Sequence, residues 1–309
     1  MRRKKRKVVL MRVAVLSAAE SWYFKDLKRA AGDAHTVRCF SFRRLATRCG
    51  SAIEVLAEGE LLTDYDAVLV RSMPPGSLEQ VVFRMDLLGR LEAAGIPVCN
   101  APRALEVAID KYLATERLRE AGLEVPQTCV CQTAAAAMEA FDQLGGRVVI
   151  KPLFGGEGRG ITALDDPALA DRAFRMLEQM GAVIYLQEFV EHAGYDLRLL
   201  VLGDEVFGIR RSNPHDWRTN VSRGAKTEAI EVTDSLREHA QRASAAIGAD
   251  FAGVDLLPAR DGRLLALEVN AVPGWRALAH TLEIDIAERV LEFLSAQVAE
   301  RRSVCMANR

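Results

Sequence analysis

Apolar and polar positions alternate in two different rhythms over the first hundred residues. Short apolar runs such as 12–17 and 65–72 predict β-strands, and amphipathic stretches such as 22–32 and 78–95 have the spacing of helices. Strands that alternate with helices favour a small α/β lobe with a largely parallel sheet, which we expect to end near residue 100. The turn after 65–72 contains two prolines and a glycine at the carboxyl end of a strand, where open α/β sheets bind ligands.

The next part of the chain predicts a compact middle lobe. Apolar residues recur with helical spacing over 103–121, a stretch that carries Lys111, and Gly122 follows as a stop signal. An extended segment and an alanine-rich helix over 133–145 come next, followed by a strand over 147–152 that breaks into a glycine-rich loop.

From residue 183 onwards, paired apolar runs predict a lobe that is mostly antiparallel. Its strands are expected over 183–190, 196–203, 205–212, 251–258 and 263–270, with helices over 235–248 and 284–300. The prediction as a whole is an α/β (α+β) fold with a basic tail over 1–10, an N-terminal parallel lobe over 11–100, a small central lobe over 101–186 and a C-terminal lobe over 187–309.

The charge distribution separates the beginning of the chain from the rest. Six of the 41 basic residues lie within the first seven positions, which leaves 35 basic against 42 acidic residues in the remainder. A basic tail can attract nucleic acid, but the acidic body argues against that partner, and short runs of like charge are usually solvated. We therefore expect a disordered extension over 1–10, with Met11 as a second plausible start, and no nucleic-acid partner.

Hydropathy and cysteine usage favour a cytoplasmic protein. No stretch approaches the ~18 uninterrupted apolar residues of a transmembrane helix, and Arg12 interrupts the apolar run that follows the basic tail, unlike a secretory signal. The six cysteines include no CxxC pair, which favours free thiols in a reducing cytosol over a disulfide framework or a zinc site. No membrane partner is expected.

A glycine-rich loop follows the predicted strand over 147–152. Residues without side chains let backbone N–H groups approach phosphate oxygens closely, and the glycines are Gly155, Gly156, Gly158 and Gly160. The loop lacks the GK[ST] ending of a Walker A motif, and an ordinary turn explains it equally well by itself. With Lys151 on the strand and Lys111 on the preceding helix as cations, it predicts a nucleotide cradle, although each lysine alone is typical of a solvated surface.

Three oxygen donors converge near the end of the chain. Asp261-Gly262 is a strong signal for a two-residue hairpin turn, and counting outward from it places Asp255 opposite Glu268. Asn270 lies on the same strand face as Glu268 because residues two apart share a face. All-oxygen ligation suits Mg²⁺ bound together with phosphates, whereas the alternative is a pair of solvated carboxylates on a surface ribbon.

Arginines are dense between the predicted phosphate and metal sites. Such a set suits transferred phosphoryl oxygens or an anionic substrate, and its members are Arg198, Arg210, Arg211, Arg218 and Arg223. The histidines are scattered without the spacing of metal ligands, which is typical of structural or surface residues.

These motifs together resemble the RimK-type branch of the ATP-grasp superfamily, whose members ligate amino acids, often glutamate, to a carboxylate. The resemblance covers roughly residues 100–295, through IDKYLATERLREAGLEVPQT, VVIKPLFGGEGRGI, LQEFV, DLRLLVLG, WRTNVSRG, GVDLL and EVNAVPG. It implies the three-lobed ATP-grasp fold. The stretch RRSNPHDWRTN is most similar to relatives that add glutamate to cofactors such as tetrahydromethanopterin, and Ala225 stands where many relatives have a glycine.

The resemblance also implies roles for individual residues. It places Lys111 and Lys151 on the ATP phosphates under a flap that contains Gly155, Gly156, Gly158 and Gly160, Glu188 and Phe189 beside adenine, Asp196 near the ribose, and Arg218 and Asn220 near the terminal phosphates. The implied ligands of Mg²⁺, or of Mn²⁺ in its place, are Asp255, Glu268 and Asn270. Arg211 and Arg223 are the implied catalytic arginines, with Arg198 beside them.

The implied reaction is ligation of a carboxylate to an amine through an acyl phosphate, with release of ADP. The expected partners are ATP, an amino acid such as L-glutamate and a carboxylate acceptor such as a methanopterin-type pterin. Two alternatives stay open: a ligase that acts on a protein tail or an amino-acid precursor, and a regulatory protein that binds ATP without turnover. The sequence also leaves open whether the chain forms a homo-oligomer.

Overall fold

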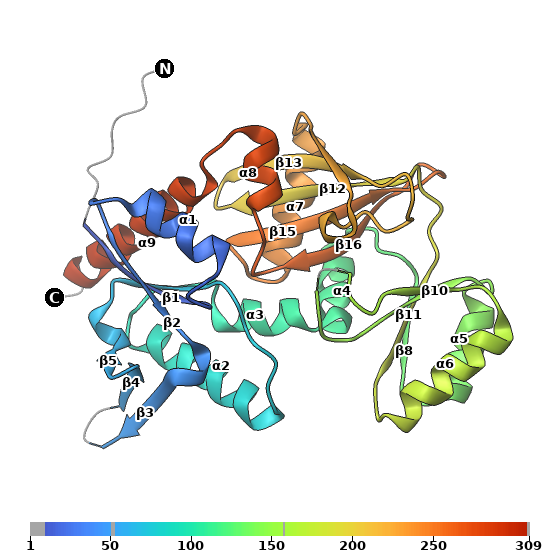
Figure 1. Ribbon diagram of the computed structural model, residues 1–309, viewed down its shortest axis with the longest axis horizontal. Coiled ribbons are helices and arrows are strands. Elements are labelled where there is room, and N and C mark those ends of the chain that lie inside the picture. The colour runs from blue at the N-terminus through green and yellow to red at the C-terminus, as the bar shows by residue number, and fades with distance from the viewer. Residues whose placement is uncertain (1–9, 51–52, 157, 308–309) are drawn as a thin grey trace.

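The computed structural model describes residues 10–50, 53–156 and 158–307 (Figure 1). The predicted basic tail therefore lies, apart from Leu10, outside the described residues. Three lobes follow one another along the chain, as predicted, and the central one projects from a body that the other two form together.

The N-terminal lobe is built on the predicted parallel sheet. Its strand order is β2-β1-β6-β7, with all pairs parallel. The strands are β1 (Arg12–Leu16), β2 (Thr36–Phe40), β6 (Ala67–Val70) and β7 (Val98–Cys99), and the helices are α1 (Trp22–Ala31) and α2 (Leu78–Ala93). Strand β6 is buried at all four positions, as expected of a parallel strand that is covered on both faces.

A small antiparallel sheet beside this lobe was not predicted. It contains β3 (Leu45–Cys49), β4 (Ile53–Ala57) and β5 (Glu60–Leu61), and two 3₁₀ turns flank it at Phe42–Arg44 and Leu62–Asp64. In β3 only Leu45 is buried, so the strand has no apolar alternation that a sequence pattern could reveal.

The single helix expected over 103–121 is wrong, because two helices occupy this stretch. Helix α3 (Pro102–Ile109) ends before Asp110, and α4 (Lys111–Glu120) begins directly after it. The Asp110 carboxylate accepts hydrogen bonds from the backbone N–H groups of Tyr112 (2.9 Å) and Leu113 (3.1 Å), as an N-cap does. Apolar spacing continues across the break, which is why periodicity did not detect it.

The central lobe is an antiparallel sheet with two helices packed on one face (Figure 1). The strand order is β10-β9-β11-β8, with β8 (Thr128–Cys131), β9 (Val148–Lys151), β10 (Thr162–Leu164) and β11 (Ile184–Glu188); the helices are α5 (Ala134–Gln143) and α6 (Pro167–Gln179). The glycine-rich segment joins the neighbouring strands β9 and β10. The expected lobe boundary after residue 186 falls inside β11, which pairs with β9 as far as Glu188.

The C-terminal lobe is a five-stranded antiparallel sheet in the order β14-β13-β12-β15-β16. Its strands are β12 (Tyr195–Leu202), β13 (Glu205–Ser212), β14 (Lys226–Ala229), β15 (Phe251–Pro258) and β16 (Leu264–Asn270), and its helices are α7 (Asp234–Ala246), α8 (Arg276–Leu282) and α9 (Ile286–Ala307). A further 3₁₀ turn occurs at Val221–Arg223. Strand β14 and helix α8 were not predicted.

Two hydrophobic cores join the first and last lobes, one on each face of the five-stranded sheet. Leu199 on β12 packs with α7 in one core, whereas the next residue, Leu200, packs with α8 and α9 in the other, because successive side chains on a strand point to opposite faces. Both cores also include residues of β1 and β6. The central lobe has a separate core, so the candidate site forms where this lobe meets the joined body.

The described part of the chain contains no helix that is long and apolar enough to cross a membrane. The described cysteines are free, in agreement with the prediction, and they are Cys39, Cys49, Cys99, Cys129 and Cys131.

Candidate active site

The hairpin of β15 and β16 places Asp255 opposite Glu268, as predicted, but by a different route. The turn is longer than the predicted two residues: Pro258 pairs with Leu264, and the backbone N–H of Ala259 bonds to the carbonyl oxygen of Arg263 at 2.9 Å. This shifts the register by one residue. A β-bulge next to Asp255 shifts the register back, so Asp255 still pairs with Glu268 although the predicted turn was wrong.

Asp255 lies in a buried network of carboxylates and arginines. Its two oxygens contact Arg198 at 2.8 Å and Arg211 at 3.0 Å, and Arg211 also binds both oxygens of Asp196, at 2.8 and 2.6 Å. Burial alone would raise the pKa of Asp255, but the two arginines hold it at about 2. Asp196 also accepts a 2.6 Å hydrogen bond from Thr219, so both of its oxygens are engaged within the protein.

Glu268 differs from Asp255 because no described residue donates a hydrogen bond to its carboxylate. Burial, and then the neighbouring charge of Asp255, raise the pKa of Glu268, and the charges of Lys111 and Lys151 oppose this shift. Asn270, two residues further along β16, accepts a 2.8 Å hydrogen bond from the N–H of Val272.

This donor set fits a hard divalent cation. It consists of two carboxylates and one amide oxygen, and the described residues include no alternative cluster of three or more His, Cys, Asp or Glu side chains. Two neighbouring carboxylates are unfavourable without positive charge, which Lys111, Lys151 and Arg198 supply near Glu268. Magnesium with oxygen ligands would add to this charge.

The two predicted lysines lie near enough to Glu268 for their charges to act on its carboxylate. Burial lowers the pKa of Lys151, at the end of β9, to about 8, and the charge of Glu268 opposes this shift. Its ammonium group donates to the side-chain carbonyl of Gln187. Lys111 donates to the backbone carbonyl of Gly155 at 2.6 Å, and burial lowers its pKa as well. The structure therefore brings both lysines and the glycine-rich segment together.

Two glycines of this segment are required by the geometry. Gly158 has a φ of 70°, in the left-handed region, and a β-carbon at this position would collide with the side-chain amide of Asn220. Gly160 has a φ of 72°, and a β-carbon there would lie 2.7 Å from Pro152. At Gly156 a β-carbon would meet nothing within 4 Å.

A narrow cavity of about 100 Å³ lies between the central and C-terminal sheets. Predicted site residues that line it are Lys151, Glu188, Phe189, Asp196, Arg211, Arg218, Asn220, Asp255 and Glu268. Its apolar lining includes Val149, Leu257 and Trp217, and the rings of Phe189 and Trp217 lie 5.5 Å apart. A cavity with both apolar and polar lining residues suits a planar base attached to phosphates. The sequence interpretation assigned no role to Trp217 or Gln187, whose only signal is adjacency to predicted residues.

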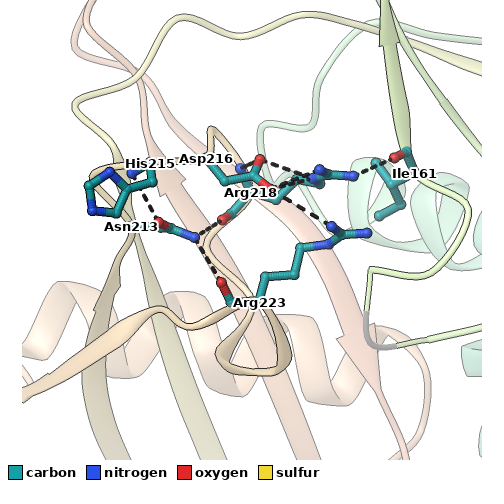
Figure 2. Close-up of polar contacts among 6 residues, drawn as sticks. All are labelled: Ile161, Asn213, His215, Asp216, Arg218 and Arg223. Atoms are coloured by element: carbon teal, nitrogen blue, oxygen red, sulfur yellow. Dashed lines mark hydrogen bonds and ion pairs between the residues drawn. The ribbon is translucent and has the colours of Figure 1, made fainter.

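Figure 2 shows how Asp216 holds two of the predicted arginines. Its carboxylate accepts hydrogen bonds from Nε (3.0 Å) and Nη2 (2.8 Å) of Arg218 and lies 3.8 Å from Arg223. Arg218 also donates to the backbone carbonyl of Ile161 at 3.1 Å, which connects this loop to the end of the glycine-rich segment. The Arg223 side chain is exposed and is not among the residues that line the narrow cavity. Sequence reasoning did not identify Asp216 as a partner of these arginines.

A second cavity, of about 920 Å³, shares the predicted metal site with the first. Residues that line both cavities are Arg211, Asn220, Asp255 and Glu268, and Asn270 lines the larger one. The N-terminal lobe contributes Trp22, Tyr23 and Arg71. Arg71 directly follows β6, so the larger cavity reaches the carboxyl end of the strand that was expected to approach a ligand.

Comparison with known proteins agrees with this geometry. The RimK-like ATP-grasp domain matches residues 108–294. A tetrahydromethanopterin:alpha-L-glutamate ligase of Methanosarcina acetivorans is 33% identical over 263 residues, which cover 76% of this chain and 81% of the relative. A probable alpha-L-glutamate ligase of Mannheimia succiniciproducens is 33% identical over 242 residues, 77% of this chain and 79% of the relative.

A solved structure has the same fold. The ATP-grasp ligase PsnB, in complex with a phosphomimetic variant of its minimal precursor, Mg and ADP, superposes with a TM-score of 0.74 at 25% identity, over 93% of this chain and 98% of that chain. The predicted resemblance and fold class are confirmed. The chain belongs to the RimK-like ATP-grasp family, and it is an ATP-dependent ligase that forms a carbon–nitrogen bond.

Proposed function

We propose that this ligase adds L-glutamate to a carboxylate of a cofactor such as a methanopterin-type pterin. The observation that carries the proposal is the pair of cavities that meet at Asp255 and Glu268. A narrow, partly apolar cavity suits the base of a nucleotide, and the larger cavity suits a bulky acceptor together with an amino acid. The relatives named as glutamate ligases support the choice of amino acid.

The nucleotide belongs in the narrow cavity. Phe189 and Trp217 would enclose the base, with Glu188 beside it and Asp196 towards the ribose. The phosphates would lie against positive or backbone groups, namely Lys111, Lys151, Arg218, Asn220 and the segment that contains Gly155, Gly156, Gly158 and Gly160. Asp255, Glu268 and Asn270 would hold Mg²⁺, which supplies neutralisation of phosphate charge when it is bound.

In this proposal the acceptor carboxylate attacks the γ-phosphorus, an acyl phosphate forms, and ADP leaves. The glutamate amine then attacks the acyl carbon, and phosphate leaves. The protein residues position the reactants and offset their charge, and they form no covalent bond with them. Arg211, held by Asp196 and Asp255, lies where both cavities meet and would offset charge on the transferred phosphoryl group. Arg223, at the exposed edge, is the weaker candidate for the same task.

The direct test is release of ADP and phosphate from Mg–ATP in the presence of amino acids crossed with carboxylate acceptors, including folate-like and methanopterin-like cofactors. We expect release only when L-glutamate and one acceptor are both present, and D-glutamate and L-glutamine serve as controls. Release with a protein tail or an amino-acid precursor would move the substrate assignment to those acceptors. Tight ATP binding without release across the panel would favour the regulatory alternative.

Replacement of Gly158 by alanine should weaken ATP binding without unfolding the protein. Forcing a non-glycine residue into the left-handed region costs about 1–2 kcal/mol, and the added methyl group collides with Asn220. We expect KM for ATP to rise roughly 5- to 30-fold. Gly181→Ala is the matched control, because Gly181 has a similar φ of 66°, its added methyl group would meet nothing within 4 Å, and it lines neither cavity. Equal effects of the two substitutions would contradict the role of this contact.

Replacement of Asp216 by asparagine should also impair ATP use. The substitution removes the negative charge that orients Arg218 and that lies near Arg223. Hydrogen bonds between charged groups contribute about 1.5–3 kcal/mol. KM for ATP should rise about 10-fold, with little change in melting temperature. Asp171→Asn is the control, since Asp171 binds the Nε of Arg175 in the same way on α6. A lower KM would show instead that Asp216 competes with phosphate for Arg218.

A further inference from the structure

Arg71 is a buried arginine without an acidic partner. Its side chain is 5% exposed, and no carboxylate of the described residues forms an ion pair with it. Nη2 donates a 2.7 Å hydrogen bond to the backbone carbonyl of Pro273, whereas Nε and Nη1 are buried and have no hydrogen-bond partner among the described residues. Buried donors are nearly always paired in native proteins, so two unpaired nitrogen atoms on one guanidinium group require an explanation.

Aromatic rings, not anions, surround this guanidinium group. Its central carbon lies 4.3 Å from the ring centre of Trp275, 4.9 Å from that of Tyr23 and 5.5 Å from that of Phe251. Cation–π contacts of this kind stabilise a positive charge but leave its N–H groups unused. The guanidinium group is therefore held in place and keeps its capacity to donate hydrogen bonds.

Arg71 lines the larger cavity but not the narrow one in which we propose the nucleotide. Tyr23 and Trp22 of α1 line the same wall, and Arg276 and His280 of α8 complete it. The Tyr23 ring lies next to the guanidinium group and also lines the cavity. Ligands of open α/β sheets bind at this position, beyond the carboxyl ends of parallel strands.

The charges around this cavity favour an anion near Arg71. Arg198 and Arg211 form ion pairs with Asp196 and Asp255. Arg71 and Arg276 have no acidic partner among the described residues, and Arg276 lies over the Trp22 ring at 5.4 Å. Glu268, in the predicted metal site, lines the same cavity where it meets the narrow one, whereas Arg71 lines the larger cavity alone. A ligand with a non-reacting anionic group for Arg71 and a reactive group for the predicted metal site would match both.

We propose that Arg71 anchors a non-reacting carboxylate of the amino-acid substrate and thereby selects an acidic amine substrate. This assignment rests on the proposed function, in which the amine of glutamate reacts and its carboxylates do not. A carboxylate can accept two parallel hydrogen bonds from the fork of a guanidinium group, which an amide or an alkyl group cannot match. Arg71 is thus a specificity-determining residue, and Arg276 supports it at the exposed rim of the cavity.

The test is calorimetric titration of the full chain with L-glutamate, both in the absence of nucleotide and in the presence of saturating Mg–ADP. Arg71→Met should weaken glutamate binding at least about 30-fold, because a buried partner of a charged hydrogen bond is lost, and should change the affinity for Mg–ADP less than 2-fold. Arg71→Lys should show an intermediate loss, since an ammonium group keeps the charge without the fork. The wild-type protein should bind glutamine and D-glutamate more weakly than L-glutamate.

Arg84→Met is the matched control. Arg84 is equally buried, donates to a backbone carbonyl (Pro74, 2.7 Å) and lies over an aromatic ring (Phe42, 5.9 Å), but it is not among the residues that line either cavity. Glutamate affinity should be unchanged in this variant. Because Arg71 also connects two lobes through Pro273, the melting temperature and the affinity for Mg–ADP establish whether each variant is folded. If Arg71→Met does not fold, Arg71→Lys provides the test.

The outcomes separate the two proposals. Unchanged glutamate affinity in both Arg71 variants, or a wild-type protein that binds Mg–ADP but no carboxylate amino acid, overturns the assignment of Arg71. In turnover assays, a raised KM for the acceptor with an unchanged KM for glutamate would place the acceptor's carboxylate at Arg71 instead. Failure to bind Mg–ADP would overturn the proposed nucleotide site, while the titration without nucleotide still tests Arg71.

Discussion

Glutamine in place of Glu268 should reduce ligase turnover by at least about 10²–10³-fold, the usual effect of losing one group that stabilises charge in a transition state. The Glu268 carboxylate lies where both cavities meet, faces Asp255 across the hairpin and receives no hydrogen bond from a described residue. In the proposed mechanism its negative charge is needed only to hold the cation. Steady-state kinetics with varied Mg²⁺ measure this loss.

The same substitution should not destabilise the protein. Burial and the charge of Asp255 raise the pKa of Glu268 in the folded state, so the charged carboxylate opposes folding at pH values above the unfolded pKa. Glutamine removes that charge, and Glu268→Gln should unfold at the same or a higher urea concentration than the wild type at pH 7. This difference should vanish as the pH falls below the unfolded pKa.

Glu228→Gln is the control for both measurements, because Glu228 belongs to the same sheet but is exposed and paired with Arg210 at 2.8 Å. It should leave turnover unchanged. Wild-type activity in Glu268→Gln would show that the metal assignment of Asp255, Glu268 and Asn270 is wrong.

Replacement of Lys151 by methionine should remove activity and increase stability. The Lys151 side chain is half-buried and lines the narrow cavity, where the proposed function places ATP phosphates. Its loss should lower kcat/KM for ATP about 10²–10³-fold. Lys226→Met, an exposed substitution on β14, should leave this value unchanged.

The stability effect follows from the sign of the pKa shift. Burial lowers the pKa of Lys151 to about 8 from 10.5, so below pH 8 the folded state holds a proton that burial disfavours. Methionine removes this penalty but leaves Gln187 without one hydrogen-bond partner. The free energy of unfolding should therefore increase by roughly 1–3 kcal/mol at pH 7. Wild-type stability should rise between about pH 8 and 10.5, where the unfolded chain binds more protons, and Lys151→Met should lack this rise.

Urea unfolding of both proteins at pH 7 and pH 9.5 tests the sign. A Lys151→Met variant that is less stable than the wild type at pH 7 and keeps the same pH dependence would show that burial of the Lys151 charge does not destabilise the protein. A variant with normal ATP kinetics would remove Lys151 from the proposed phosphate site.

Local patterns in the chain were sufficient for most of the elements. The strand that ends at Lys151, the glycines that follow it and the pairing of Asp255 with Glu268 were predicted correctly, because strand periodicity and turn residues act over a few neighbouring positions. The same reasoning missed the break at Asp110 and the true length of the turn before β16. In both cases a hydrogen bond to the backbone or a bulge changed the geometry while the apolar pattern continued unchanged.

The sequence by itself thus determined the family, the three lobes and the residue types available for phosphate and metal chemistry. Only the tertiary structure decided which of these groups have partners. Asp255 is held by Arg198 and Arg211, whereas among the described residues Glu268 has no hydrogen-bond donor and Arg71, which lies against Trp275, has no acidic partner. The physical reason is that the energy of a charged side chain depends on its burial and on partners that can lie two hundred residues away, as Pro273 does from Arg71.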